Sequence, residues 1–511
     1  MPDTALEPRA AYIEALEIMR TASDLGAASA LLGWDQETYM PPAAAAARAD
    51  QLSTLSAVTH SIVTSDRAVC LAEFFRDNLR HLNGELNDWE KRIARVFTRD
   101  VLRAIRLPET FVRRKTQVTA LAQEAWKQAR QQASFALFRD HLAQIIELAI
   151  EEAELRGYQD HRYNALLDLY EPGLTVGTLD PVFRRLEQAT IEILRFVRDA
   201  GHVPDDSILK QHFPGQAQLA AAQSIIAQMG FDFSAGRVDL SAHPFCTSFA
   251  IADVRLTTRI NERDLRSCLF GLIHEAGHGL YEQGMRSDLE RTFARDGASM
   301  GIHESQSLFW ENIIARSEEF WHWALPILRA YFPEQLSDVS PQAMYAAINR
   351  VEPSHYRIES DEVTYNLHII LRYRLEKAML DGTLTADDIP HVWNALTEEL
   401  LGLTVHNDAQ GCLQDIHWSF GGIGYFPSYT LGKLYAAMLR SALLRAMPDA
   451  PDHVRRGDFS PIRQWLREVV HQWGRTMEPS ELISAATGQP LSEEPFVAYV
   501  WEKVKRVYGQ E

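Results

Sequence analysis

The sequence predicts a mainly α-helical protein that carries a small β-sheet near the middle of the chain. Apolar side chains recur at three- and four-residue intervals through most of the 511 residues, as in helices that bury one face. Proline and glycine fall mostly between these apolar stripes, where helices end. We find no internal repeat and no long linker, so we expect residues 1–511 to form one large helical unit rather than several domains.

The first predicted helix covers residues 9–32, where a stripe of apolar side chains runs from Tyr12 to Leu32. After Pro42, an alanine run at 43–47 predicts the start of another helix. Similar stripes predict helices near residues 86–106, 112–155, 179–199, 215–229, 304–331, 362–380, 390–402, 430–446 and 462–473.

Residues 237–260 alternate between apolar and polar side chains, and this pattern predicts two or three short strands. Val254 and Leu256 face one side of such a strand, whereas Arg255 and Thr257 face the other. The strands come directly before the stretch GLIHEAGHGL. We therefore expect the small sheet to lie beside the helix that this stretch forms.

The composition narrows the classes of function. A net charge of −18 argues against nucleic-acid partners and anionic membranes, which need clustered Lys and Arg. The four cysteines form no CxxC pair, so neither a thiolate zinc site nor a disulfide framework is indicated. The sequence shows neither a signal peptide nor an apolar run of about eighteen residues, and we expect a cytoplasmic protein without a membrane span.

The stretch GLIHEAGHGL places His274 and His278 one helical turn apart, with Glu275 between them. Residues i and i+4 share a helix face about 6 Å apart, so both imidazoles can reach one metal ion. Glu275 lies beside that ion and can accept a proton from water, which makes this the H-E-x-x-H zinc signature. Asn261 or Asp264 can cap the helix. The alternative is a pair of core histidines satisfied by hydrogen bonds.

A catalytic zinc needs a third protein ligand and an open position for water. Glu282 lies about 12 Å along the helix from His274, too far to share the ion. The segment 301–312 opens an apolar helix and contains the adjacent residues His303 and Glu304. Both types of side chain bind zinc, so their chemistry leaves the choice open. Alternatively, Glu304 is an ordinary carboxylate near the start of a helix and binds no metal.

Gly277 and Gly279 follow the metal-facing turn of the same helix. Because glycine lacks a Cβ, a neighbouring helix or strand can approach the helix closely at these positions. We expect this approach to bring Glu304 or the 237–260 strands into range of the metal.

Several further segments are similar to motifs of one family, and together they span nearly the whole chain. The sequence resembles the carboxypeptidase Taq family of metallocarboxypeptidases. The similar segments are LLGWDQETYMPPAAAAARADQLSTL (31–55), HPF (243–245), DVRLT (253–257), HEAGH (274–278), HESQ (303–306) and GCLQDIHW (411–418), the last followed by GIGYFPSY. One family motif departs at 356–361, YRIESD, where Tyr356 replaces an aliphatic residue and Ser360 replaces alanine.

The resemblance implies a mainly helical fold split by a deep groove, with two lobes beside it, usually in a homodimer. It implies one metal ion per chain, zinc or alternatively cobalt, held by His274, His278 and Glu304. It also implies release of single residues from the free C-termini of peptides, with broad specificity.

Peptide hydrolysis also needs hydrogen-bond donors for the oxyanion, and an exopeptidase must recognise the terminal carboxylate. We predict that His417 and Tyr425, eight residues apart around a glycine-rich bend, are the donors. The glycines would let the phenol move toward the metal. Arg357 is the first candidate for the carboxylate and Arg255 the second, because a guanidinium pairs both oxygens. We expect His243 to line the site.

His417, Tyr425 and the two arginines each have a purely structural alternative as well. His417 and Tyr425 would then be buried polar groups of a structural loop, and the two arginines would form structural ion pairs. Two other functions also stay open. An endo-acting zinc oligopeptidase would use the same metal chemistry, and a non-catalytic helical binding protein would retain only the motif. The joint presence of Glu275, His417 and Tyr425 argues against the binding protein.

Overall fold

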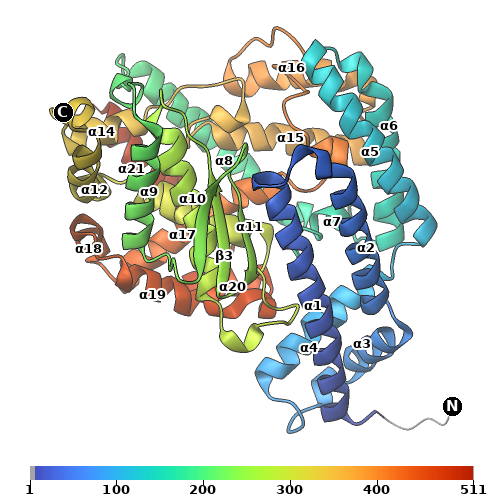
Figure 1. Cartoon of the computed structure of the whole chain (residues 1–511). Coiled ribbons are helices and arrows are strands. Elements are labelled where there is room, and N and C mark those ends of the chain that lie inside the picture. The colour runs from blue at the N-terminus through green and yellow to red at the C-terminus, as the bar shows by residue number, and fades with distance from the viewer. Residues whose placement is uncertain (1–5, 510–511) are drawn as a thin grey trace.

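The computed structural model describes residues 6–509, and helices dominate it, as the apolar stripes predict (Figure 1). The first described helices form a hairpin in which α1 (Pro8–Thr38) and α2 (Ala45–Val63) lie side by side. The next two helices, α3 (Asp66–Asn78) and α4 (Asp88–Ala104), pack on α1. These three helices share a hydrophobic cluster that includes Met19, Phe75 and Phe97.

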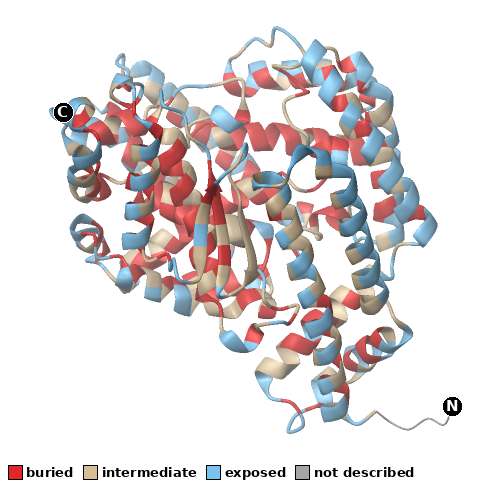
Figure 2. Ribbon diagram, viewed as in Figure 1, coloured by how far each residue is buried: buried red, intermediate tan, exposed pale blue. Residues whose placement is uncertain are grey.

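The remaining elements form a second and larger hydrophobic cluster. Its helices are α5 (Glu109–Gln132), α6 (Arg139–Arg156), α7 (Tyr163–Leu167), α8 (Val176–Asp199), α9 (Gly215–Met229), α10 (Leu265–Gly284), α11 (Met300–Leu308), α12 (Glu318–Tyr331), α13 (Pro333–Leu336), α14 (Pro341–Ile348), α15 (Tyr365–Asp381), α16 (Ile389–Leu401), α17 (Pro427–Ala446), α18 (Ala450–Arg456), α19 (Ser460–Val469), α20 (Pro479–Thr487) and α21 (Glu494–Tyr508). Figure 2 shows the buried residues concentrated on the central helices α10, α15 and α17. Helix α2, by contrast, has no buried side chain along its whole length, Ala45–Val63.

The predicted strands form a small sheet in the order β1-β3-β2. Its strands are β1 (Gly236–Leu240), β2 (Cys246–Ala250) and β3 (Asp253–Thr258). The central strand β3 pairs in parallel with β1 and antiparallel with β2. Val254 and Leu256 are buried and β3 packs against α10, so the sheet lies beside the helix that carries the histidines.

Two of the predicted helical ranges are divided in the structure. The range 112–155 becomes α5 and α6, because Ala133 adopts a left-handed conformation with φ of 50° and ends α5. The range 304–331 becomes α11, a π-helical turn at Phe309–Ile314, and α12. The alanine run at 43–47 does lead into a helix, after a short 3₁₀ turn at Pro42–Ala44.

None of the helices within residues 6–509 combines the length and the apolar character that crossing a membrane requires.

Candidate metal centre

Helix α10 carries the H-E-x-x-H motif through the larger hydrophobic cluster. The Asp264 side chain caps its first turn by accepting a hydrogen bond from the Arg266 N–H at 3.0 Å, as the sequence predicts. The apolar flanks of the motif are buried, which fixes the rotation of the helix. The side chains of His274 and His278 remain 21% and 14% exposed, so solvent reaches the face that bears them.

Three of the predicted ligands converge. The ligand atoms of His274, His278 and Glu304 all lie within 4.8 Å of one another. Glu304 Oε2 is 3.7 Å from Nε2 of His274 and 3.5 Å from Nε2 of His278. Ligands at about 2.1 Å from a tetrahedral zinc lie about 3.4 Å apart, so these separations fit one ion.

The two glycines of α10 allow the close approaches that this geometry needs. A Cβ added to Gly277 would lie only 2.6 Å from the Cα of Ser307 and 2.7 Å from the carbonyl oxygen of Gln306. Helix α11 therefore packs backbone against backbone on α10, directly after Glu304. A Cβ on Gly279 would lie 2.8 Å from the ring of Phe231 and 3.1 Å from Leu256 of β3, so this glycine admits both Phe231 and the sheet.

Glu311, which the sequence analysis missed, orients the first histidine. Its Oε2 lies 2.9 Å from Nδ1 of His274, and its Oε1 accepts a hydrogen bond from Arg316 Nη2 at 3.0 Å. A carboxylate on the second ring nitrogen fixes the tautomer and the ring orientation of a metal-binding histidine. The signal in the sequence is the seven-residue spacing from Glu304 to Glu311, which returns a helix to nearly the same face.

His303 faces the second histidine rather than the candidate ion. Its Nδ1 lies 2.6 Å from Nδ1 of His278, and its Nε2 lies 2.8 Å from Oε1 of Glu282. Arg295 Nη1 in turn lies 3.3 Å from Oε2 of Glu282. Glu304 therefore faces the Nε2 atoms of the two histidines, whereas His303 faces the opposite nitrogen of His278. Glu282, too far along α10 to bind the same ion, holds His303 instead.

The carboxylates around the histidines differ in their pKa values. Burial raises the pKa of Glu275 to about 7, although His274 opposes this shift. Burial would also raise the pKa of Glu304, but His274 and His278 hold it at about 2. For Glu311, His274 and Arg316 outweigh burial and hold the pKa below the usual range. Glu304, which supplies the oxygen ligand, is therefore ionised, as metal binding requires.

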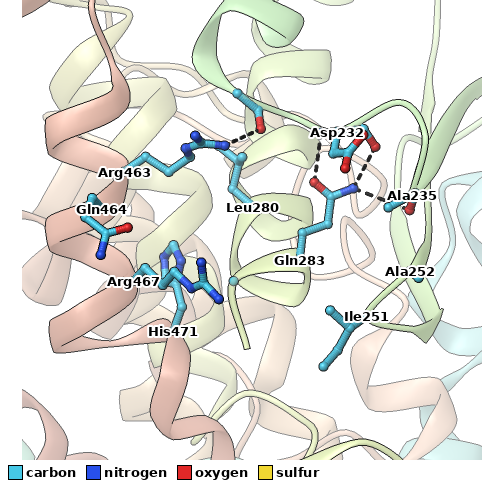
Figure 3. Close-up of a pocket in the computed structure, with 12 residues that line it drawn as sticks. Asp232, Ala235, Ile251, Ala252, Leu280, Gln283, Arg463, Gln464, Arg467 and His471 are labelled. Carbon is cyan, nitrogen blue, oxygen red and sulfur yellow. Dashed lines mark hydrogen bonds between the residues drawn. The ribbon is translucent and has the colours of Figure 1, made fainter. Parts of the chain in front are cut away.

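The C-terminal end of α10 is fixed at a pocket of about 300 Å³ (Figure 3). Gln283 accepts a hydrogen bond from the Asp232 N–H at 3.0 Å and donates one to the Asp232 carbonyl at 3.0 Å. On the other side, Nε2 of buried His471 lies 3.0 Å from Oε1 of Gln306 on α11. These bonds tie the end of α10 and the middle of α11 to neighbouring elements, which limits their relative movement.

His417 and Tyr425 lie together in the bend before α17, with ring centroids 5.2 Å apart. Nε2 of buried His417 lies 3.1 Å from the hydroxyl of Tyr429, a residue that the sequence analysis missed. Helix α17 packs closely on α11, and a Cβ on Gly432 would lie 2.8 Å from the Cβ of Glu304. Burial raises the pKa of Tyr425, and the charge of Glu304 adds to the shift. The bend therefore belongs to the surroundings of Glu304.

Arg357 belongs to a buried charged cluster. Its Nε and Nη2 donate to Oδ1 of Asp415 at 3.1 and 2.7 Å, and its Nη1 donates to the Tyr365 hydroxyl at 2.7 Å. The fully buried Arg372 donates from Nε to Oδ2 of the same carboxylate at 2.7 Å. The two guanidinium groups outweigh burial and hold the pKa of Asp415 below its usual range. Two cations and one anion leave the cluster with one positive charge.

Arg255 and His243 lie in different surroundings. Arg255 donates from Nε to Oδ1 of Asp253 at 3.0 Å, and its guanidinium carbon lies 4.4 Å from the ring centre of Trp34 on α1. The phenyl ring centre of Phe249 lies 4.9 Å from the same carbon. Arg255 and Arg357 thus each pair with a carboxylate, the arrangement stated above as the structural alternative for both arginines. His243 is exposed in the loop between β1 and β2.

A cleft of about 1100 Å³ opens beside the first turns of α10. Its lining includes Phe270 and Gly271 of α10, Arg316, and the segment with Tyr356 and Asp361. The cleft therefore separates the start of the histidine-bearing helix from the motif that contains Arg357.

A helix with two histidines at i and i+4, an adjacent glutamate and a carboxylate from a second helix define the class of metallopeptidases. Within that class, the chain belongs to the carboxypeptidase Taq (M32) metallopeptidase family, whose sequence model matches residues 14–504. This confirms the predicted family and an enzyme that hydrolyses peptides. The helical fold with its small sheet is also confirmed.

Relatives match along almost their whole length. The chain is 38% identical to carboxypeptidase 1 of Bacillus subtilis, over 97% of this chain and 98% of the relative. It is 39% identical to thermostable carboxypeptidase 1 of Pyrococcus furiosus, over 94% and 95% of the two chains. The solved M32 carboxypeptidase of Deinococcus radiodurans R1 superposes with a TM-score of 0.94 at 36% identity, and covers 98% of this chain and 100% of that chain.

Proposed function

We propose that this protein is a zinc carboxypeptidase that removes single residues from the free C-termini of peptides, with broad specificity. The proposal rests on the convergence of His274, His278 and Glu304 ligand atoms within 4.8 Å. Two imidazoles and one carboxylate suit one zinc ion per chain and leave a fourth position for water or substrate. Cobalt is the alternative ion.

Glu275 is the proposed general base, because it follows the first histidine ligand on the same helix. A bound ion would supply a Lewis acid that lowers the pKa of water and polarises the scissile carbonyl. Glu275 would accept the proton of the attacking water and pass it to the departing nitrogen. Glu311 and His303 would hold the two imidazole rings in their binding orientation.

His417 and Tyr425 are the proposed oxyanion donors. Nδ1 of His417 is buried and has no hydrogen-bond partner among the described residues, while Nε2 faces the Tyr429 hydroxyl. Nδ1 lies 3.9 Å from Oδ1 of Asp415, so the proposed donor is Nε2, on the side of the ring that faces Tyr429 and its neighbour Tyr425. Each such donor typically lowers the barrier by about 3–4 kcal/mol.

Arg357 is the proposed site for the terminal carboxylate of the substrate. The positive charge that remains on its cluster with Asp415 and Arg372 supports this role, because an added carboxylate would neutralise it. The residues on either side of Arg357, namely Tyr356 and Ile358, line the cleft of about 1100 Å³, so open space adjoins this motif. Arg255 is the second candidate, and His243 would line the site.

We further propose that residues 1–511 act as one catalytic unit, with two lobes beside the groove, and form a homodimer. The family match over residues 14–504 supports a single unit. Resemblance to the family supports the dimer. A monomeric sedimentation coefficient at working concentration would contradict it.

The test combines metal analysis with cleavage of peptides that carry either a free or an amidated C-terminus. We expect one zinc per chain, stepwise release of terminal residues, and no cleavage of the amidated peptide. Glu275→Gln should retain the metal and lose nearly all turnover, because it is a proposed base and not a ligand. Internal cleavage of the amidated peptide would favour an oligopeptidase. Full activity in Glu275→Gln would exclude the mechanism.

A further inference from the structure

Glu376 is a fully buried glutamate on α15, behind the glycine-rich bend that carries His417 and Tyr425. An ionised side chain in such a place is expensive unless hydrogen bonds compensate for its lost hydration. Burial raises the pKa of Glu376 to about 7, even though three hydrogen bonds oppose the shift. A group with this cost calls for a specific explanation.

The carboxylate of Glu376 binds both arms of the bend. Its Oε1 accepts a hydrogen bond from Trp418 Nε1 at 2.9 Å, and its Oε2 accepts one from the Gly424 N–H at 3.0 Å. Trp418 directly follows His417, and Gly424 directly precedes Tyr425. One rigid carboxylate thus sets the distance between the chain positions next to the two proposed donors.

The third hydrogen bond to the carboxylate comes from outside the bend. The Tyr163 hydroxyl of α7 donates to Oε2 of Glu376 at 2.7 Å, and Tyr163 is fully buried. The bend also presses directly on α7, because a Cβ on Gly424 would lie 2.9 Å from the carbonyl carbon of Leu166. Gly424 has φ of 94°, a conformation that other residues rarely adopt. The bend is therefore held between α7 and α15 rather than free to swing.

We propose that Glu376 is a positioning residue for peptide hydrolysis, which holds His417 and Tyr425 at the spacing that oxyanion stabilisation requires. The inference rests on the proposed roles of those two residues. Glu376 acts through the backbone of the bend, without contact to substrate or metal. A displacement of about 1 Å in a catalytic donor can lower a rate by about 100-fold.

The first experiment replaces Glu376 with glutamine. The amide has one accepting oxygen, so it can satisfy Gly424 or Trp418 but not both. We expect kcat to fall by about 10- to 100-fold, with KM and bound metal close to wild type. Unchanged kcat in a folded, metal-loaded Glu376→Gln enzyme would overturn the proposal.

Two variants of its partners form a matched pair, because each removes one of the three hydrogen bonds to the same carboxylate. Trp418→Phe removes a bond to the bend, and it should lower kcat by about 10-fold. Tyr163→Phe removes the bond that does not touch the bend, and kcat should stay within about twofold of wild type. Equal losses in both variants would show a role in stability alone. This pair also serves if Glu376→Gln fails to fold.

A double variant separates positioning from general stability. If Glu376 acts through Tyr425 as well as His417, the fold loss of kcat caused by Glu376→Gln should be at least about threefold smaller once Tyr425 is phenylalanine. Multiplicative losses would overturn the inference. Wild-type kcat in Tyr425→Phe would overturn the donor role of Tyr425 and this inference with it. A loss in Tyr425→Phe with none in Glu376→Gln would overturn the inference alone.

Discussion

Oε2 of Glu311 lies 2.9 Å from Nδ1 of His274, on the side of the ring opposite the nitrogen that faces Glu304. Glu311 belongs to the π-helical turn at Phe309–Ile314, and Arg316 holds its other oxygen. One helix segment therefore supplies a carboxylate to each nitrogen of the same imidazole.

Glu311→Gln should weaken metal binding. Loss of the charge makes His274 a poorer ligand and frees its ring to turn, and such changes typically lower metal affinity by about 10- to 100-fold. Competition with a chelator measures the change. Glu318→Gln is the control, because Glu318 is a buried glutamate on α12 that lies 3.4 Å from Nε2 of His322, a histidine outside the candidate metal centre. Equal affinities in the two variants would refute this role for Glu311.

Gly277→Ala should release the metal by separating α10 from α11. The added methyl group would meet the backbone at Ser307 and Gln306, at 2.6 and 2.7 Å, which cannot move without shifting α11. Overpacking of this kind costs about 1–3 kcal/mol of stability. Metal content after dialysis and the melting temperature report the effect.

Gly271→Ala is the matched control on the same helix, since its nearest neighbour, the Thr258 hydroxyl, would lie 3.5 Å away. This control should keep its metal and gain up to about 1 kcal/mol from helix propensity. Full metal retention in Gly277→Ala would mean that α11 does not need this close approach.

Arg357→Lys should raise KM for peptides with a free C-terminus by about 10-fold or more. Lysine lacks the planar fork that pairs two oxygens, and a charge-assisted bond contributes about 1.5–3 kcal/mol. Arg255→Lys is the same exchange at an arginine whose charge is balanced by a single carboxylate, Asp253, and it should leave KM unchanged. The reverse order of effects would make Arg255 the carboxylate site.

Glu171 should make stability depend on pH. This buried carboxyl accepts a hydrogen bond from the Gly301 N–H at 2.5 Å, at the start of α11, and burial raises its pKa to about 7 from 4.5. The folded protein therefore binds the proton more tightly than the unfolded chain. The resulting stabilisation is complete below pH 4.5 and is lost as the pH rises through about 7.

Relative to Glu171→Gln, the wild type should accordingly lose on the order of 3 kcal/mol of unfolding free energy between pH 4.5 and pH 8. Urea unfolding of both proteins at the two pH values, with metal in excess, measures the difference. Parallel pH profiles would show that Glu171 titrates normally in the folded state.

The sequence predicts well which face of α10 bears the histidines and which face is buried. The i, i+4 spacing and the apolar flanks of the motif are local properties of the chain. It leaves His303 and Glu304 undecided, since adjacent residues point in different directions and both bind metals. The choice depends on Glu282, 21 residues earlier, which engages His303. Only the packing of α10 against α11 brings that pair together.

Helix breaks were harder to predict than helices. Ala133 ends α5 although alanine is the strongest helix former. Nearby, the Phe135 N–H donates to Asp408 Oδ2 at 2.8 Å, a contact 273 residues away in sequence. Tertiary contacts of this kind override local propensity. The proposed anchoring role of Glu376 is hidden for the same reason, because its partners belong to α7 and to the bend, both far from Glu376 in the sequence.

The π-helical turn at Phe309–Ile314 contains Glu311 and lies between Glu304 and helix α12. In a regular helix, the direction of Glu304 and Glu311 would fix which face of α12 is buried. Each residue advances an α-helix by about 100° around its axis. The bond from the Ala315 N–H to the Trp310 carbonyl at 2.9 Å closes a wider loop that accommodates one extra residue. The extra residue therefore lets Glu304 and Glu311 point at the histidines while α12 buries a different face. A one-residue deletion within 309–314 would regularise the helix and turn one of the two surfaces away from its partner.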